Sequence, residues 1–181
     1  MSMPDLRIRP ARIDDKDDIF RLIHTYPDKL VQRTGEYIIE RIGNFYVAEY
    51  NENVVGCSAF ETYGIESEDP EKPDVVLCEI KSLAVNSSYQ RQKIGTDLVT
   101  RCITWARKEG FKTVFSLTHS DNMDFFSRLK FKRTDRKDFP EKIWLDCKNC
   151  PKYEENAADP FARCDEIAVV RYLTPNLKYP S

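Results

Sequence analysis

The feature that most constrains the fold is the run at residues 75–85 (VVLCEIKSLAV), where only Glu79, Lys81 and Ser82 are polar. Such near-continuous hydrophobicity is typical of a central strand that is buried on both faces. Residues 94–110 then follow a helical period that ends at Gly110. The apolar positions on one face of this helix are Ile94, Leu98, Cys102, Trp105 and Ala106. A central strand followed by an amphipathic helix predicts a mixed α/β sheet flanked by helices.

Weaker patterns supply the rest of the predicted fold. We expect strands at residues 6–10, 45–50, 54–63, 112–118, from 131 onwards and at 166–173. Helices are expected from residue 14 to about 27, at 34–43 with Gly43 as the C-terminal cap, and at 122–129. Residues 51–53 suit a hairpin turn. The length of 181 residues predicts a single domain over 1–181, with a Cys-rich loop at 139–166 before the last strand.

Charge and hydropathy exclude several classes of protein. Lys and Arg number 28 against 30 Asp and Glu, and this balance disfavours a dedicated nucleic-acid binder. Charged residues interrupt every window of roughly 20 residues that a membrane span requires. The first ten residues do not resemble a secretory signal. We therefore expect a cytoplasmic protein with neither a nucleic-acid nor a membrane partner.

The six cysteines are too sparse for a disulfide scaffold, and reduced thiols are the leading interpretation. A structural metal or a redox role is left open for Cys147, Cys150 and Cys164. Asp146 or Asp165 would complete a set of metal ligands. Because this cluster lacks a histidine, we predict no metal. His24 and His119 are expected to be surface or structural residues.

The polar turn at residues 89–95, between the central strand and the helix, is a candidate anion site. The amides at a helix N-terminus, together with the macrodipole, favour a phosphate group. Arg91 and Lys93 would strengthen this preference. Gly95 alone does not make a phosphate loop, so a solvated connection is an equal alternative on spacing alone.

This strand, turn and helix resemble the acetyl-CoA-binding motif of the GNAT superfamily of N-acetyltransferases, where a strand ending in Leu-Ala-Val leads to a glycine-containing turn. The resemblance extends to residues 8–15, 45–49, 54–59 and 122–131. Within the superfamily, residues 79–85, the pair Phe125 and Phe126, and the tail at 140–152 and 164–166 are most similar to short stand-alone enzymes of the N-acetylglutamate synthase type. The resemblance implies one α/β GNAT-like domain, a mixed central β-sheet flanked by α-helices.

The same resemblance implies a reaction. Acetyl-CoA is the expected co-substrate, and the expected acceptor is the α-amine of a small amino acid. L-glutamate is the first choice, which would place the chain at the entry to arginine synthesis. The alternatives are another small amine, a protein N-terminus, or a non-catalytic acyl-CoA-binding module. The assembly is left open between a monomer and a homodimer.

Glu79 matches the position of the family's general base, and burial in an apolar strand makes a carboxylate a stronger base. The alternative is an ordinary carboxylate paired with a neighbouring lysine. Lys81, two residues on and on the same strand face, is our candidate for binding an acceptor carboxylate, ahead of Arg21, Arg33 and Lys142. Its alternative is pairing with a surface acid. The resemblance assigns cofactor binding to Leu83, Ala84, Val85, Gln90, Arg91, Gln92, Lys93, Ile94, Gly95, Thr96, Asn122 and Phe125.

Two residues depart from the family pattern. Lys93 replaces the first glycine of the turn, and we expect its ammonium to pair with the pyrophosphate of the cofactor. Phe126 stands where many relatives carry a tyrosine that protonates the leaving thiolate, and a phenyl ring has no proton to donate. The identity of the general acid is therefore open. For Asn122, a helix-cap role is the alternative to cofactor binding.

Overall fold

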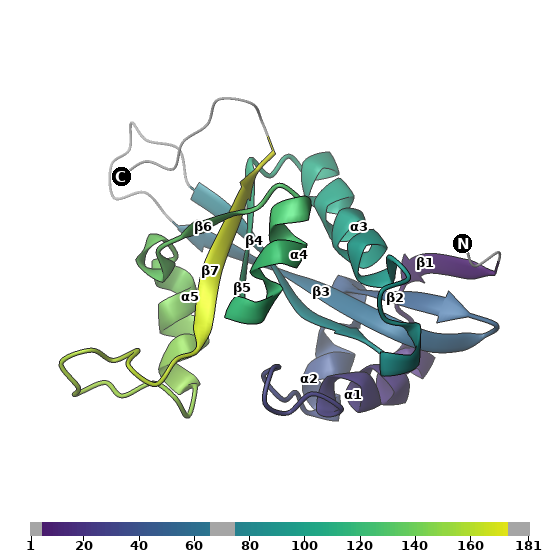
Figure 1. Cartoon of the computed structure of the whole chain (residues 1–181), viewed down its shortest axis with the longest axis horizontal. Helices are drawn as coiled ribbons and strands as arrows, with labels where there is room; N and C mark the ends of the chain where they lie inside the picture. Colours follow the sequence, from purple (N-terminus) through teal and green to yellow (C-terminus); the bar gives the residue numbers. More distant parts are fainter. Residues whose placement is uncertain (1–4, 66–74, 174–181) are drawn as a thin grey trace. The chain divides into compact units, whose positions relative to one another are not determined.

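The computed structural model describes residues 5–65 and 75–173, which form seven strands and five α-helices (Figure 1). The strands are β1 (Leu6–Pro10), β2 (Phe45–Tyr50), β3 (Asn53–Ile65), β4 (Val75–Val85), β5 (Thr113–His119), β6 (Lys132–Thr134) and β7 (Glu166–Tyr172). The helices are α1 (Lys16–His24), α2 (Gly35–Glu40), α3 (Ile94–Lys108), α4 (Met123–Arg128) and α5 (Pro140–Leu145). Hydrogen bonding places the strands in the order β1-β2-β3-β4-β5-β7-β6. The β4–β5 pair is parallel and β5–β7 is antiparallel, so the predicted mixed α/β sheet is confirmed.

The chain divides into two compact units, each described below by itself. The N-terminal unit contains the residues up to Glu61 together with Ile80–Gly110, and the C-terminal unit contains Thr62–Glu79 and the residues from Phe111 onwards. Strands β3 and β4 contribute residues to both units. The boundaries of the predicted domain, residues 1–181, stay a prediction.

Alternating residues of β2 and β3 build two apolar layers in the N-terminal unit. Phe45, Val47, Cys57 and Ala59 belong to the core formed with α1 and α2. On the opposite face, the ring of Phe60 stacks on Trp105 of α3 at 3.7 Å between centroids. This alternation follows from the period of two in a strand. The helices therefore flank the sheet as expected.

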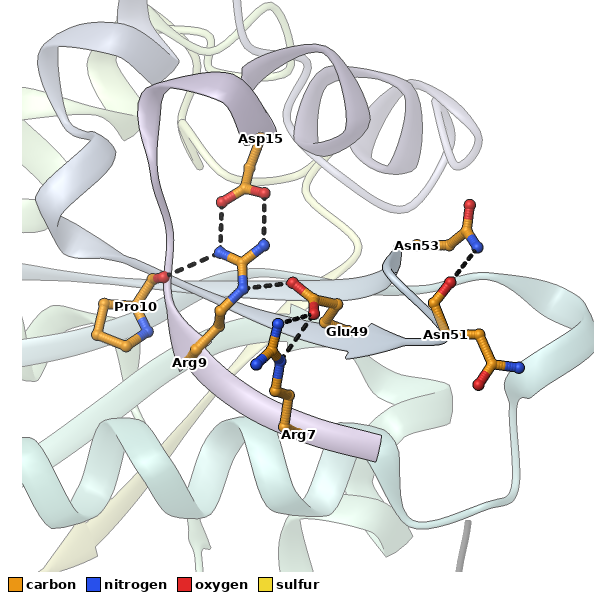
Figure 2. Close-up of polar contacts among 7 residues, drawn as sticks. All are labelled: Arg7, Arg9, Pro10, Asp15, Glu49, Asn51 and Asn53. Carbon is orange, nitrogen blue, oxygen red and sulfur yellow. Dashed lines mark hydrogen bonds and ion pairs between the residues drawn. The ribbon is translucent and has the colours of Figure 1, made fainter. Parts of the chain in front are cut away.

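A polar ladder joins the first strand pair to the start of α1 (Figure 2). The guanidinium of Arg9 donates two hydrogen bonds to Asp15, at 2.7 and 2.8 Å, and Nε donates to Glu49 at 2.6 Å. Arg7 donates to the same Glu49 carboxylate. Burial acts to raise the pKa of Asp15, but hydrogen bonds from Arg9 and the Arg12 amide outweigh it and hold that pKa below its ordinary value. Hydrogen bonds from Arg9 and Arg7 likewise lower the pKa of Glu49.

In the C-terminal unit, β7 lies between β5 and β6 and pairs antiparallel with both (Figure 1). One face of these strands, with Phe115, Ala168 and Val170, forms a core with Tyr63, Leu77 and Phe139. The ring of Phe139 stacks on that of Phe115 at 4.1 Å and 8°. Phe139 immediately precedes α5, so this contact seats α5 on the sheet.

Two local predictions were wrong. Residues 140–145, expected within a loop, form α5, which begins with a proline at its first turn. This segment is only about one helical turn long and lies next to the cysteines. It is too short to show the repeat of apolar residues that identifies a helix in a sequence. Gly43 does not cap α2, because the helix ends at Glu40 and Arg41 leaves the helical region with φ −114°. Gly110, by contrast, follows α3 with φ +87°, as a C-terminal glycine should.

The remaining elements agree with the prediction to within a few residues at each end. Asn51 and Glu52 both have positive φ, 47° and 63°, as the hairpin turn requires. Strand β4 is buried on both faces where its side chains are described, with Leu77, Cys78 and Ile80 at 1% exposed or less. Among the described residues, the helices are too short or too polar to cross a membrane.

Candidate active site

In the C-terminal unit, the carboxylate of Glu79 is held on the central strand with only 2% of the residue exposed. The hydroxyl of Tyr63, on β3, donates a hydrogen bond of 2.8 Å to Glu79 Oε2. The ammonium of Lys142, on α5, lies 3.1 Å from the same oxygen. It also donates to Asp146 Oδ2 at 2.6 Å, one helical turn further along. The predicted catalytic carboxylate is therefore buried and held by a phenol and an ammonium.

Strand parity explains why these groups meet. Glu79 is paired with Phe115 in the parallel β4–β5 register, so its side chain lies on the face that carries Phe115. Phe139 packs on that ring and brings Lys142, three residues later, over the same face. Glu166 on β7 faces the same side, because its register partner His119 lies at even spacing from Phe115.

The charges around Glu79 are mostly negative. Burial raises the pKa of Glu166, with Lys142 acting to lower it and Glu79 to raise it further. Burial also raises the pKa of Cys147 to about 11, while the nearby Lys142 ammonium acts to lower it. The Lys142 ammonium thus lies among the carboxylates of Glu79, Asp146 and Glu166.

Lys81 belongs to the N-terminal unit, where its side chain is buried and its ammonium pairs with Glu61. The other oxygen of Glu61 lies 3.5 Å from Nε of Arg41, whose guanidinium covers the ring of Tyr37 at 4.3 Å. This cluster matches the alternative interpretation of Lys81 as the partner of an acid. Its role in binding an acceptor stays a prediction.

The end of β4 is anchored from a distant segment. Tyr26, just after α1, donates a 2.5 Å hydrogen bond to the carbonyl oxygen of Val85. The side-chain amide of Gln90 donates to the same oxygen at 3.1 Å and to the Tyr26 hydroxyl at 2.9 Å. Gln90, predicted to bind the cofactor, therefore holds the start of the turn. Within β4, Ser82 has φ +51°, a left-handed kink just before Leu83 and Ala84.

The predicted anion site has the backbone of a tight turn entering a helix. Arg91 and Lys93 have φ of 60° and 67°, and both side chains are exposed, as is that of Gln92. The backbone hydrogen bond across this junction runs from the Asp97 amide to the Lys93 carbonyl at 2.9 Å. The amides of the first turn of α3, which include those of Ile94, Gly95 and Thr96, precede it and have no acceptor within the helix. Ile94 buries its side chain, so only its backbone can meet a ligand at this turn.

Lys93 therefore adopts a left-handed backbone conformation that glycine would adopt with less strain. Gly56, on the adjacent strand β3, lies where a side chain would meet neighbouring atoms. An added Cβ would lie 3.2 Å from the carbonyl oxygen of Ala84 and from the side chains of Ile94 and Leu98. Glycine at this position lets α3 approach the sheet closely.

Asn122 and Phe125 lie at the start of α4 in the C-terminal unit. Asn122 is the N-cap residue, but its amide donates to Thr118 Oγ1 at 3.0 Å and makes no capping hydrogen bond. Phe125 is half-buried and meets Phe126 edge-on at 5.1 Å. Phe126 is buried and packs against Phe131, so the ring at the expected general-acid position is part of the core.

The three tail cysteines are half-buried free thiols. In the part of the chain that the structure describes, the sulfur atoms of Cys147, Cys150 and Cys164 do not form a ligand set within 4.8 Å of one another. His24 stacks on Phe20 at 3.8 Å. The Nδ1 of His119 lies 3.2 Å from Asp121.

Sequence reasoning missed Tyr63 and Tyr26, and considered Lys142 only as a candidate behind Lys81 for binding the acceptor. A tyrosine in an alternating strand has the same local pattern whether it packs in a core or contacts a base. Tyr26 stands in a polar connection 59 residues before its partner Val85. The alternation of residues along the strand could have indicated the face on which Tyr63 lies. It could not have indicated which residue Tyr63 contacts on that face.

The sequence pattern of the Acetyltransferase (GNAT) family matches residues 11–131. An uncharacterised N-acetyltransferase of Chlorobaculum tepidum is 37% identical over 175 residues, which cover 96% of this chain and 100% of that protein. An amino-acid acetyltransferase of Pseudomonas fluorescens is 34% identical over 62% of this chain, a match that spans 24% of its own length. The fold is similar to that of Neisseria gonorrhoeae N-acetylglutamate synthase complexed with coenzyme A and N-acetyl-glutamate, with a TM-score of 0.73 and 24% identity over 93% of this chain and 35% of that one. The chain belongs to the GNAT family of acetyltransferases, enzymes that use acetyl-CoA as co-substrate.

Proposed function

We propose that this acetyltransferase acts on the α-amine of a small amino acid, with L-glutamate as the first candidate, and that Glu79 is its general base. The observation that carries the proposal is the Glu79 carboxylate, buried on the central strand and contacted by Tyr63 and Lys142. The names of the Pseudomonas and Neisseria proteins support an amino acid as acceptor. Because this chain spans only a minority of each, the acceptor is proposed and not assigned.

The reaction begins with a proton transfer. An α-amine has a reference pKa of about 7.7–8.0, so much of it is protonated near neutral pH. Glu79 accepts a proton from this ammonium, directly or through a water, and the nitrogen lone pair becomes available.

The lone pair then attacks the carbonyl carbon of the acetyl thioester, and a C–N bond forms as the carbonyl oxygen becomes an oxyanion. Main-chain N–H groups around Leu83, Ala84 and Val85 are proposed to hold the pantetheine arm and to stabilise this oxyanion. Collapse breaks the C–S bond and expels the thiolate of CoA. The amide nitrogen loses its remaining extra proton, and the thiolate takes one up. Phe126 cannot supply that proton.

For the cofactor, we propose that the pyrophosphate meets the first-turn amides of α3. The left-handed residues Arg91 and Lys93 shape the turn, and their exposed side chains add positive charge. That Asn122 and Phe125 bind the cofactor stays a prediction. A cytoplasmic location and a homodimer stay predictions.

The proposal is tested by release of CoA from acetyl-CoA, measured by thiol detection against twenty amino acids, several polyamines and a peptide with a free N-terminus. We expect a glutamate-dependent rate that falls at least a hundredfold in Glu79→Gln, while acetyl-CoA binding by calorimetry changes little. The matched control is Glu155→Gln, at an exposed position of the same unit. Turnover with a polyamine or the peptide would replace glutamate with that acceptor. A Glu79→Gln variant as active as the control would contradict the role of Glu79.

A further inference from the structure

The tail helix α5 contributes one buried ammonium to the neighbourhood of the proposed base. Lys142 is only 7% exposed, and its Nζ lies 3.1 Å from Glu79 Oε2 and 2.6 Å from Asp146 Oδ2. Lysine is seldom buried to this degree unless it is paired. Its four-carbon stem is flexible, so the two carboxylates determine where its charge lies.

The position of this ammonium is set by the packing of α5 against the sheet. Phe139 is fully buried and stacks on Phe115, and it fixes the start of α5 on the sheet. Lys142 and Asp146 are four residues apart, the spacing at which helical side chains meet. Asp146, the residue that follows α5, thus supports Lys142, and Lys142 reaches across to β4.

We infer that Lys142 is a positioning residue for Glu79: its ammonium, steadied by Asp146, orients the carboxylate and favours its ionised form, an inference that rests on Glu79 being the general base. A buried carboxylate without a cation tends to be protonated, and a protonated acid cannot accept a proton from the acceptor amine. A cation in direct contact restores the charged form. Lys142 therefore orients the proposed base and stabilises its negative charge.

Other titratable groups face Glu79 from three further elements. Tyr63 on β3 donates to the same oxygen, Glu166 on β7 and Cys147 after α5 interact with Glu79 electrostatically, and Asp146 shares the ammonium. The pKa values of Glu166 and Cys147 are both raised. This direction is expected where the effect of burial on the pKa is larger than the opposite effect of one nearby cation. Because the Glu79 carboxylate acts on the pKa of Glu166, the signals of the two residues need separate assignments.

The test is a carbon-13 NMR titration of the full-length protein labelled at glutamate Cδ, with Glu79→Gln and Glu166→Gln used to assign the two signals. In Lys142→Met we expect the titration midpoint of the Glu79 carboxyl to rise by one pH unit or more. In Asp146→Asn we expect a shift in the opposite direction, because Lys142 is then no longer shared. Lys142→Arg keeps the charge and should restore the wild-type midpoint to within about half a unit.

Lys152→Met is the matched control, since Lys152 also pairs with an aspartate, Asp165 at 2.8 Å, but lies half-exposed. Lys152 acts on the pKa of Glu166, so this variant should shift the Glu79 midpoint slightly, and far less than Lys142→Met does. The acidic limb of kcat/KM against pH should move with the NMR midpoint in each variant, whereas a merely structural role would lower the rate equally at every pH.

Two failures are distinguishable. If the wild-type protein transfers acetyl groups to none of the acceptors, the proposed function fails, while the titration still decides the role of Lys142. If the Glu79 midpoint stays in place in Lys142→Met, or moves the same way in both variants, the inference is overturned. Should Lys142→Met not fold, Lys142→Gln takes its place with the same expected rise in the Glu79 midpoint.

Discussion

The hydroxyl of Tyr26 is hydrogen-bonded to the carbonyl oxygen of Val85, which ties the segment after α1 to the last residue of the central strand. Gln90 completes a three-member arrangement by donating to both oxygens. The end of β4, from which the turn to α3 departs, is therefore fixed by a side chain that lies 59 residues earlier in the sequence.

Replacing Tyr26 by Phe should destabilise the protein by about 1 kcal/mol, because the Val85 carbonyl loses one of two donors. We also expect a higher KM for acetyl-CoA, since the turn that follows becomes less ordered. Urea unfolding and initial rates measure the two effects. Tyr50→Phe, whose ring meets Tyr89 edge-on in the same unit, is the control. Equal effects in the two variants would mean that the Tyr26 hydroxyl has no special role.

Substituting Lys93 separates its backbone from its charge. Lys93→Gly relieves a left-handed φ of 67° and should stabilise the protein by about 0.5–1 kcal/mol, a net value because glycine also gains freedom in the unfolded chain. Lys93→Gln keeps the strain and removes only the charge. If the ammonium pairs with the pyrophosphate, calorimetry should show weaker acetyl-CoA binding in both variants. Unchanged affinity in Lys93→Gln would show that the side chain does not contact the cofactor.

The ladder of Arg9, Asp15 and Glu49 predicts acid sensitivity of the fold. Both carboxyls have pKa values below their ordinary values when folded. Their contribution is therefore complete above the unfolded pKa values, about 3.9 and 4.3, and is lost as the pH falls through the lower folded values. Urea midpoints from pH 7 to pH 3 should decline more steeply in wild type than in Asp15→Asn. Parallel curves would exclude the ladder as the cause.

Cys147 should be the slow thiol of the tail. Burial raises its pKa to about 11, so only about one molecule in a thousand carries the thiolate at pH 8. Brief iodoacetamide treatment followed by peptide mass spectrometry should find Cys147 modified later than solvent-exposed thiols. The rate at which Cys147 is modified should increase with pH up to about 11. Early modification at neutral pH would instead support the redox alternative for this segment.

Much of the fold follows from local patterns. The run at 75–85 predicted a strand buried on both faces, and Leu77, Cys78 and Ile80 are buried in alternating directions. Helix α3 and its closing Gly110 followed from period and a single glycine. These features depend on neighbours within a few residues, which is the range over which a sequence pattern carries information.

Helix α5 illustrates the limit of such patterns. Only one turn long beyond its proline, it is held by Phe139 stacking on Phe115, a contact between residues that are far apart in the sequence. Short helices gain their stability from packing rather than from propensity. The same limit explains why Lys142 was considered for the acceptor and not for Glu79.

The sequence by itself determined which strand is central, which carboxylate it carries and where the turn of the acetyl-CoA motif begins, because period, polarity and motif spacing are local properties. Only the tertiary structure decided that β7 inserts between β5 and β6, that Tyr26 reaches Val85, and that Lys142 and Tyr63 meet at Glu79. Burial can be read from hydrophobicity, but the partner of a buried polar group depends on long-range packing, since many segments of similar pattern compete for the same face.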